Sequence, residues 1–167
     1  MSLGEALILL NQVQEGEKKI REGMKLDQRI GLRCYFSGRY SFLAEGKAKR
    51  DQIGQGLGIL DEGLAMIEET DERYREAEHH RVKGTLLLVQ GNEADAETSL
   101  HKAIEVARKQ KAKSWELRAA TDLARLWGSQ GKVDEAYHLL APVYEWFTEG
   151  FDTPDLIAAK GLLEDFS

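Results

Sequence analysis

Two glycine-rich stretches carry residue types that bind phosphate groups in other proteins, residues 54–58 (GQGLG) and residues 128–133 (GSQGKV). A phosphate-binding loop needs glycines at fixed spacing between a strand and a helix. In the first stretch Ile59 stands where the dinucleotide-binding pattern requires its last glycine, and in the second Val133 replaces the Ser or Thr of a phosphate loop. Neither stretch follows a strand-like pattern. We therefore interpret both as structural and predict no nucleotide site.

The metal-ligating and nucleophilic side chains form only incomplete sets. Glu76 with His80, and Glu97 with His101, are spaced so that each pair shares a helix face. Each pair lacks a third ligand nearby, whereas protein zinc sites use three or four. Cys34 is the only cysteine and has no evident base partner, so a small buried residue is the favoured interpretation. These patterns predict a non-catalytic chain with no metal and no cofactor.

Composition narrows the class of protein further. The 167 residues carry a net charge of −6, which disfavours direct binding to nucleic acid. One cysteine allows no internal disulfide, and the absence of a long apolar run or a signal peptide predicts a cytoplasmic chain without membrane contact. Residues 1–3 resemble a start derived from an expression vector. We therefore expect a fragment of a longer protein.

The pattern of apolar residues is helical along nearly the whole chain, with repeats at three and four residues. Turn signals separate helices that we predict near 2–10, 13–27, 29–49, 52–69, 72–90, 93–110, 112–129 and 132–148, the last kinked by Pro142. A capping helix is predicted at 153–166, since Thr153 suits an N-cap and Pro154 the first helical position. Its packing face is predicted to hold Ile157, Ala158, Gly161, Leu162 and Phe166.

A period of about 40 residues organises these helices. Two columns hold small residues: Gly4, Ala44, Gly84 and Ala124, and then Gly16, Gly56, Ala96 and Ala136. A turn column holds residues that tolerate left-handed backbone: Asn11, Asp51, Gly91 and Gly131. A further column is aliphatic: Ile20, Leu60, Leu100 and Leu140. The clear mismatch is Lys47, in a column that otherwise holds large apolar residues.

These columns predict a helix–turn–helix unit in which small residues let paired helices approach closely. The predicted fold is an all-α, right-handed α-solenoid of four helical hairpins plus a C-terminal capping helix. The array spans residues 4–150, with units at about 4–27, 29–69, 72–110 and 112–148. Gly54 and Gly58 fall in no column, so we expect residues 51–58 to be the softest part of the array.

The order of small residue, large residue, glycine turn, alanine and aliphatic resembles the tetratricopeptide repeat (TPR), with a longer period than the usual one of about 34 residues. Residues 4–166, most specifically from 77 onward, are similar to the C-terminal helical region of bacterial signalling proteins. Those proteins carry a cyclase-like or DNA-binding domain and a regulatory ATPase module before such repeats. The first two units depart from the pattern, with Asp51 at the usual glycine turn.

The resemblance implies a groove lined by the first helix of each unit. Carried onto this chain, its candidate partner-binding residues are Glu45, Lys49, Glu78, Arg81, Thr85, Arg118, Thr121, Arg125 and Ser129. Arg81, Arg118 and Arg125 would form a basic strip that grips a carboxylate. The alternative is that they are solvated charges paired with Glu78 and Glu116. The two-asparagine clamp of chaperone-binding repeats is not matched, so that ligand is not predicted.

The sequence therefore favours a non-catalytic scaffold for a protein or peptide partner, or for other domains of a larger signalling protein. Two alternatives remain open. The groove would serve as a sensor of a small effector, or the chain would be a homo-oligomerising arm. For the aromatic cluster at Tyr35, Phe36, Tyr40 and Phe42, core packing is the favoured role of most members, and a homodimer contact is the alternative.

Overall fold

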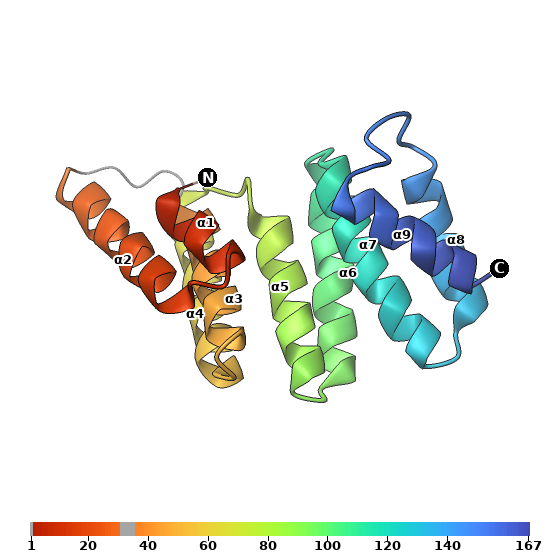
Figure 1. Cartoon of the computed structure of the whole chain (residues 1–167), viewed down its shortest axis with the longest axis horizontal. Coiled ribbons are helices and arrows are strands. Elements are labelled where there is room, and N and C mark those ends of the chain that lie inside the picture. Colours follow the sequence, from red (N-terminus) through yellow and green to blue (C-terminus); the bar gives the residue numbers. More distant parts are fainter. Residues whose placement is uncertain (1, 31–35) are drawn as a thin grey trace.

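A computed structural model describes residues 2–30 and 36–167, and every regular element in these two ranges is an α-helix. The helices are α1 (Leu3–Leu9), α2 (Val13–Arg29), α3 (Phe36–Ala48), α4 (Ile53–Thr70), α5 (Glu76–Val89), α6 (Glu93–Lys109), α7 (Lys113–Ser129), α8 (Val133–Tyr144) and α9 (Pro154–Asp165). Figure 1 shows them following one another along the long axis of the molecule. Cys34 and Tyr35 lie outside the described residues, so the predictions for them stay untested.

The helices pack as four hairpins, α1 with α2, α3 with α4, α5 with α6, and α7 with α8. The odd-numbered helices also contact one another in sequence from α1 to α9 (Figure 1). Helix α9 packs on both α7 and α8, as expected of a cap. The predicted all-α array of four hairpins and a C-terminal helix is thereby confirmed.

The two small-residue columns face each other within the hairpins. A Cβ atom added at Gly4 would lie 2.8 Å from the carbonyl oxygen of Gly16, and one added at Gly16 would lie 2.8 Å from that of Gly4. In the next unit a Cβ atom at Gly56 would lie 3.0 Å from the carbonyl oxygen of Ala44. Such distances leave no room for larger side chains. The columns therefore exist because the paired backbones nearly touch.

The turn column also behaves as its residue types predict. Asn11 and Asp51 have φ of 64° and 58°, and Gly91 and Gly131 both have φ of 78°. Each of these residues lies in the short turn between the two helices of a hairpin. Left-handed backbone here reverses the chain within a few residues.

Two turns between successive hairpins have no glycine at the equivalent position. Asp71 and Lys111 both have φ of 55° and stand one repeat apart. Asp tolerates left-handed backbone, as at Asp51, but a lysine seldom adopts it, so the residue type at Lys111 gave no hint of this turn. The turn at Asp71 also moves the start of α5 to Glu76, four residues beyond the predicted start at 72.

Other predicted bounds needed correction at Pro142 and in the cap. Helix α8 ends at Tyr144 rather than at 148, because Pro142 has no N–H to donate and only a short helical segment follows it. In α9 the buried residues are Leu156 and Ala159, whereas Ile157 is 56% exposed. Leu162 and Phe166 of the predicted packing face do contact the core, so the prediction for the cap was right in part and wrong at Ile157.

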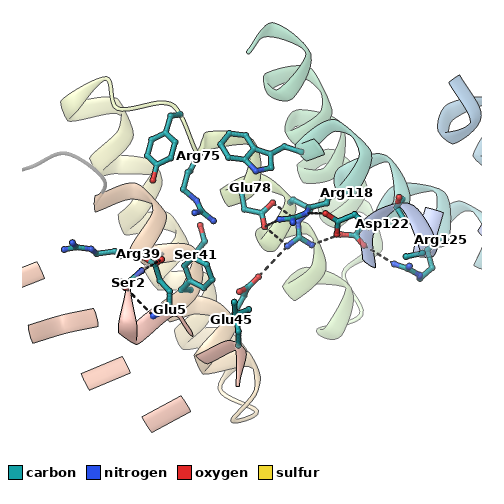
Figure 2. Close-up of a pocket in the computed structure, with 18 residues that line it drawn as sticks. Ser2, Glu5, Arg39, Ser41, Glu45, Arg75, Glu78, Arg118, Asp122 and Arg125 are labelled. Carbon is teal, nitrogen blue, oxygen red and sulfur yellow. Dashed lines mark hydrogen bonds and ion pairs between the residues drawn. The ribbon is translucent and has the colours of Figure 1, made fainter. Parts of the chain in front are cut away.

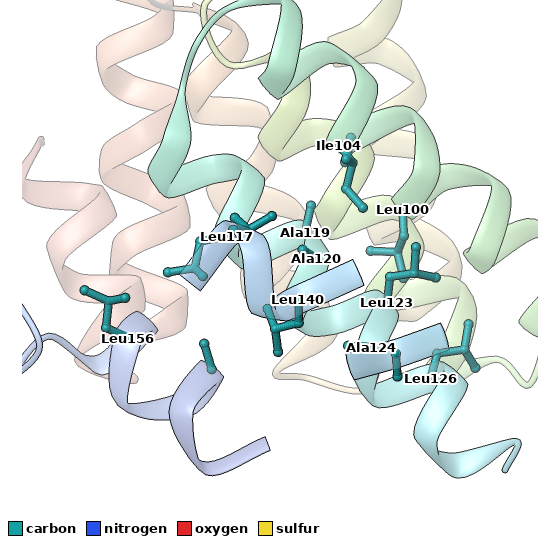
Figure 3. Packing of buried hydrophobic residues seen from close by; sticks show 14 residues of the cluster. Leu100, Ile104, Leu117, Ala119, Ala120, Leu123, Ala124, Leu126, Leu140 and Leu156 are labelled. Carbon is teal, nitrogen blue, oxygen red and sulfur yellow. The ribbon is translucent and has the colours of Figure 1, made fainter. Parts of the chain in front are cut away.

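The hydrophobic core forms two main clusters. The C-terminal cluster joins α6, α7, α8 and α9 around Leu117, Leu123 and Leu140 (Figure 3). The N-terminal cluster joins the first two hairpins around Leu43 and Leu60. All four members of the aliphatic column are buried in these clusters.

The mismatch at Lys47 has a local partner. Its Nζ donates a hydrogen bond to Glu17 Oε2 at 3.0 Å, and both side chains are largely buried between the first two units. The ion pair with Glu17 neutralises the positive charge of Lys47 at a position that holds an apolar residue in the other units.

Candidate binding groove

A groove of about 860 Å³ runs along the odd-numbered helices. Its walls are built from α1, α3, α5, α7 and α9 and from the residues just before α1 and α5, and none of its lining residues belongs to an even-numbered helix. Figure 2 shows charged side chains from successive units pointing toward one another across it. The first helix of each hairpin thus lines the groove, as the repeat resemblance implied.

The groove contains six of the nine candidate residues: Glu45, Glu78, Arg81, Arg118, Thr121 and Arg125. The other three do not line it. Lys49 donates to the carbonyl oxygen of Ile8 at 2.8 Å, and the hydroxyls of Thr85 and Ser129 donate to carbonyls of their own helices.

Arg81 is the centre of an ion network that crosses three units. Its Nε and Nη2 donate to the two oxygens of Glu78, each at 2.9 Å, and its Nη1 donates to Asp122 Oδ2 at 2.8 Å. Glu45 Oε1 lies 3.5 Å from its Nη2. Because these carboxylates belong to α3, α5 and α7, Arg81 ties consecutive first helices together.

Arg118 and Arg125 are also paired. Arg118 Nε donates to Asp155 Oδ2 at 2.6 Å, which joins α7 to the cap, and its Nη1 lies 3.7 Å from Glu78. Arg125 Nη1 donates to Asp122 Oδ1 at 3.0 Å (Figure 2). The three arginines are therefore parts of a mixed network. Glu116, the other proposed partner, is bonded instead to Arg108 and Lys113.

Burial and pairing set the protonation of this network. Burial by itself would raise the pKa of Glu78, but the hydrogen bonds from Arg81 and the charge of Arg118 outweigh it and hold that pKa below its ordinary value. Burial by itself would lower the pKa of Arg81. The hydrogen bonds to Glu78 and Asp122, and the negative charges of these two residues, outweigh burial and raise that pKa above its ordinary value. The Glu78–Arg81 pair is thus fully ionised at neutral pH. For Glu45, burial prevails and raises the pKa of its carboxyl.

Several groove residues were missed by the sequence analysis: Phe42, Tyr74, Arg75, Trp115, Asp122 and Asp155. Asp122 had a usable signal, since it stands four residues after Arg118 and three before Arg125 on one helix. Arg75 and Trp115 stand one repeat apart, just before or at the start of a first helix, and neither is among the nine candidate residues. Tyr74 and Trp115 lie with ring centroids 6.3 Å apart.

The other chemical candidates lie away from the groove. His101 Nε2 is 3.9 Å from Glu97 Oε1, and Glu97 accepts a hydrogen bond from the Trp127 indole at 2.8 Å. Glu76 contacts Arg73 rather than a metal-binding partner. In residues 2–30 and 36–167 no group of three His, Cys, Asp or Glu side chains is arranged to hold a metal ion. Nor does any helix there have the length and hydrophobicity of a membrane span.

Both glycine-rich stretches are helical or helix-flanking. Residues 54–58 lie within α4, and residues 128–133 form the end of α7, the turn at Gly131 and the first residue of α8. Neither follows a strand. Both stretches therefore lack the strand–loop–helix context of a phosphate-binding loop.

Known structures with TPR-like repeats have a similar fold. Two crystal structures of a kinesin light chain protein with nearly identical TPR-like repeats from Podosopora anserina share 18% sequence identity with the chain, with TM-scores of 0.69 and 0.68. Each alignment covers 98% of this chain, and 81% and 82% of those chains. The crystal structure of BtubC from P. vanneervenii has 17% identity and a TM-score of 0.78, over 98% of this chain and 68% of that one. No protein-family model and no curated protein matches the sequence. The fold is a TPR-like repeat solenoid.

Proposed function

We propose that this chain is a non-catalytic scaffold that holds a segment of a partner protein in the groove of its odd-numbered helices. The observation that carries the proposal is the groove itself, about 860 Å³, formed by four successive units and the cap. Extended concave surfaces of this kind are how repeat solenoids generally bind their partners. The TPR-like repeats of the similar structures support the same interpretation.

The lining favours a polypeptide over a small effector. Charged side chains of both signs line the groove, and Phe42, Tyr74 and Trp115 add aromatic surface. A long, open surface with spaced charges suits a chain that has side chains of its own to pair with them. Tyr and Trp are also the residue types enriched where binding energy concentrates in protein interfaces.

The wider setting is proposed on the sequence resemblance. It places the repeats in a larger bacterial signalling protein with a cyclase-like or regulatory ATPase domain, acting in the cytoplasm. The similar solved structures support the repeat fold and carry no argument for that parent protein. The oligomerisation arm stays the second candidate, and a monomer in light scattering at every concentration would remove it.

Affinity capture with matched charge reversals tests the groove. Arg125→Glu and Glu45→Lys alter the groove, whereas Lys109→Glu alters an exposed position of α6 on another face. We expect one set of proteins, quantified by mass spectrometry, to be retained by the wild type and the α6 variant and lost from both groove variants. Equal retention by all four forms would contradict the proposal.

A further inference from the structure

Arg75 differs from the other arginines of the groove in its pairing. Among the described residues five arginines line the groove, and the other four each form an ion pair with a carboxylate. For Arg75, no carboxylate oxygen of the described residues lies within the 4.0 Å that defines such a pair. Figure 2 shows its side chain entering the groove from the loop before α5.

The side chain of Arg75 is nevertheless held in place. The aliphatic part of the side chain packs directly against Gly38, because a Cβ atom added there would lie 2.6 Å from Arg75 Cδ. The guanidinium carbon stands 5.1 Å from the centre of the Phe42 ring, a distance at which a cation is attracted to the ring face. The Tyr74 hydroxyl lies against the same glycine, since the added Cβ atom would stand 3.0 Å from its oxygen. A guanidinium fixed in this way loses little freedom when it binds a ligand.

The donors of Arg75 are incompletely used. Its Nε is buried without a hydrogen-bond partner, so an incoming ligand would meet the terminal Nη1 and Nη2 groups. A guanidinium presents its N–H groups in a planar fork that matches two oxygens of a carboxylate. An incoming carboxylate would therefore supply the acceptors and the counter-charge that the groove does not.

The surroundings favour a singly charged ligand. Glu45 and Glu78 both interact electrostatically with Arg75, although Arg81 is the closer cation to each. A doubly charged phosphate doubles its attraction to Arg75 and its repulsion from these carboxylates alike, but its cost of leaving water rises with the square of its charge. A phosphorylated side chain is therefore disfavoured at this position.

We propose that Arg75, seated on Gly38 and Phe42, binds an Asp or Glu side chain of the partner segment and fixes its register in the groove. This inference rests on the proposed function, since it names what one position of the bound segment must be. Arg75 lies outside the positions that the repeat frame assigns to ligand binding.

The test uses a phage-displayed library of random 12-residue peptides, selected on the immobilised full chain. We expect the enriched peptides to share an acidic residue. A synthetic copy of one should bind the Arg75→Gln variant about tenfold more weakly or worse, the size expected of a lost bond between charged groups. Replacing its Asp or Glu by the amide should weaken binding to the wild type equally, with no further loss in the Arg75→Gln variant.

Matched variants separate this role from a general one. Arg50→Gln removes an arginine outside the groove that has a carboxylate partner in Glu17, and we expect less than about a twofold effect. Arg75→Lys keeps the charge without the planar fork, so its binding should be intermediate. Thermal melting followed by circular dichroism verifies that each variant is folded.

Three results would overturn the inference, and they are distinguishable. If the peptides lose binding to the Arg125→Glu and Glu45→Lys variants but bind the Arg75→Gln variant as well as the wild type, the role of Arg75 is refuted and the proposed function stands. Tighter binding of a phosphoserine peptide than of the acidic one would refute the carboxylate. Failure to enrich any peptide above background would count against the proposed function, and the inference would fall with it.

Discussion

The three glycines of residues 54–58 provide a test of the packing within a single helix turn and a half. All three lie in α4, where glycine is less favourable than alanine by about 1 kcal/mol in a helix interior. A Cβ atom at Gly54 or Gly58 would meet no atom within 4 Å. At Gly56 it would lie 2.9 Å from Leu86 Cδ1 and 3.0 Å from the carbonyl oxygen of Ala44. The same substitution should therefore act in opposite directions.

We expect Gly58→Ala to raise the free energy of unfolding by about 1 kcal/mol, and Gly54→Ala by about half as much because it stands in the first helical turn. Gly56→Ala should lower it by about 1 kcal/mol, since overpacking costs about 1–3 kcal/mol and the gain in helix propensity offsets only part of that. Urea unfolding followed by circular dichroism measures all three. For a chain of this length, 1 kcal/mol corresponds to about 2–4 °C in Tm. If Gly56→Ala stabilises the protein as much as Gly58→Ala, the close approach of α3 and α4 is refuted.

Three further predictions follow from buried charges and from the soft helix start. His79 is fully buried with Nδ1 3.0 Å from Ser41 Oγ, and burial lowers its pKa from 6.5 to about 4. The free energy of unfolding should therefore fall by about 2 kcal/mol between pH 7 and pH 5. A urea midpoint that does not change over that pH range would contradict this prediction. Arg81→Met should lower the free energy of unfolding, measured in urea, by about 3 kcal/mol, because it leaves buried Glu78 without its main partner. Adding Glu78→Leu in a double variant should restore most of that lost free energy. Amide hydrogen exchange should be faster in residues 53–58 than around Leu100, and equal rates would show that the first turn of α4 is not soft.

The direction of the pH effect follows from which form of His79 the fold accepts. Because the folded pKa lies below the unfolded one, the neutral imidazole is favoured in the folded protein. Its contribution to stability is complete above pH 6.5 and is lost as the pH falls toward 4. His80 shifts in the same direction through burial and the charges of Lys102 and Lys83, so it adds to the effect.

Much of the fold could be predicted because its determinants are local. The small residues at Gly4 and Gly16, and the left-handed turn at Asn11, lie within one hairpin and repeat with the same spacing. The helix bounds were less predictable where a turn used an ordinary residue such as Lys111. The packing face of α9 was predicted only in part: Leu162 and Phe166 contact the core and Ile157 does not, because docking on α7 and α8 depends on tertiary packing rather than on the pattern of α9 alone.

The groove was predictable in position and less so in chemistry. The repeat frame located Arg81, Arg118 and Arg125 on its wall. Their carboxylate partners could not be predicted, because contacts such as Arg81 with Asp122 join helices of different units. Arg75 was missed since it precedes α5 and its role depends on the space that Gly38 leaves in another helix.

The most direct test of the central claim is site-specific photo-crosslinking to a captured partner. A benzoylphenylalanine side chain would replace Ala158, which lines the groove on α9, or Thr98, which is exposed on α6 outside it. We predict that the partner crosslinks at position 158 and not at position 98. Crosslinking at position 98 alone would show that the partner binds the face of the even-numbered helices, and it would contradict the groove as the binding surface.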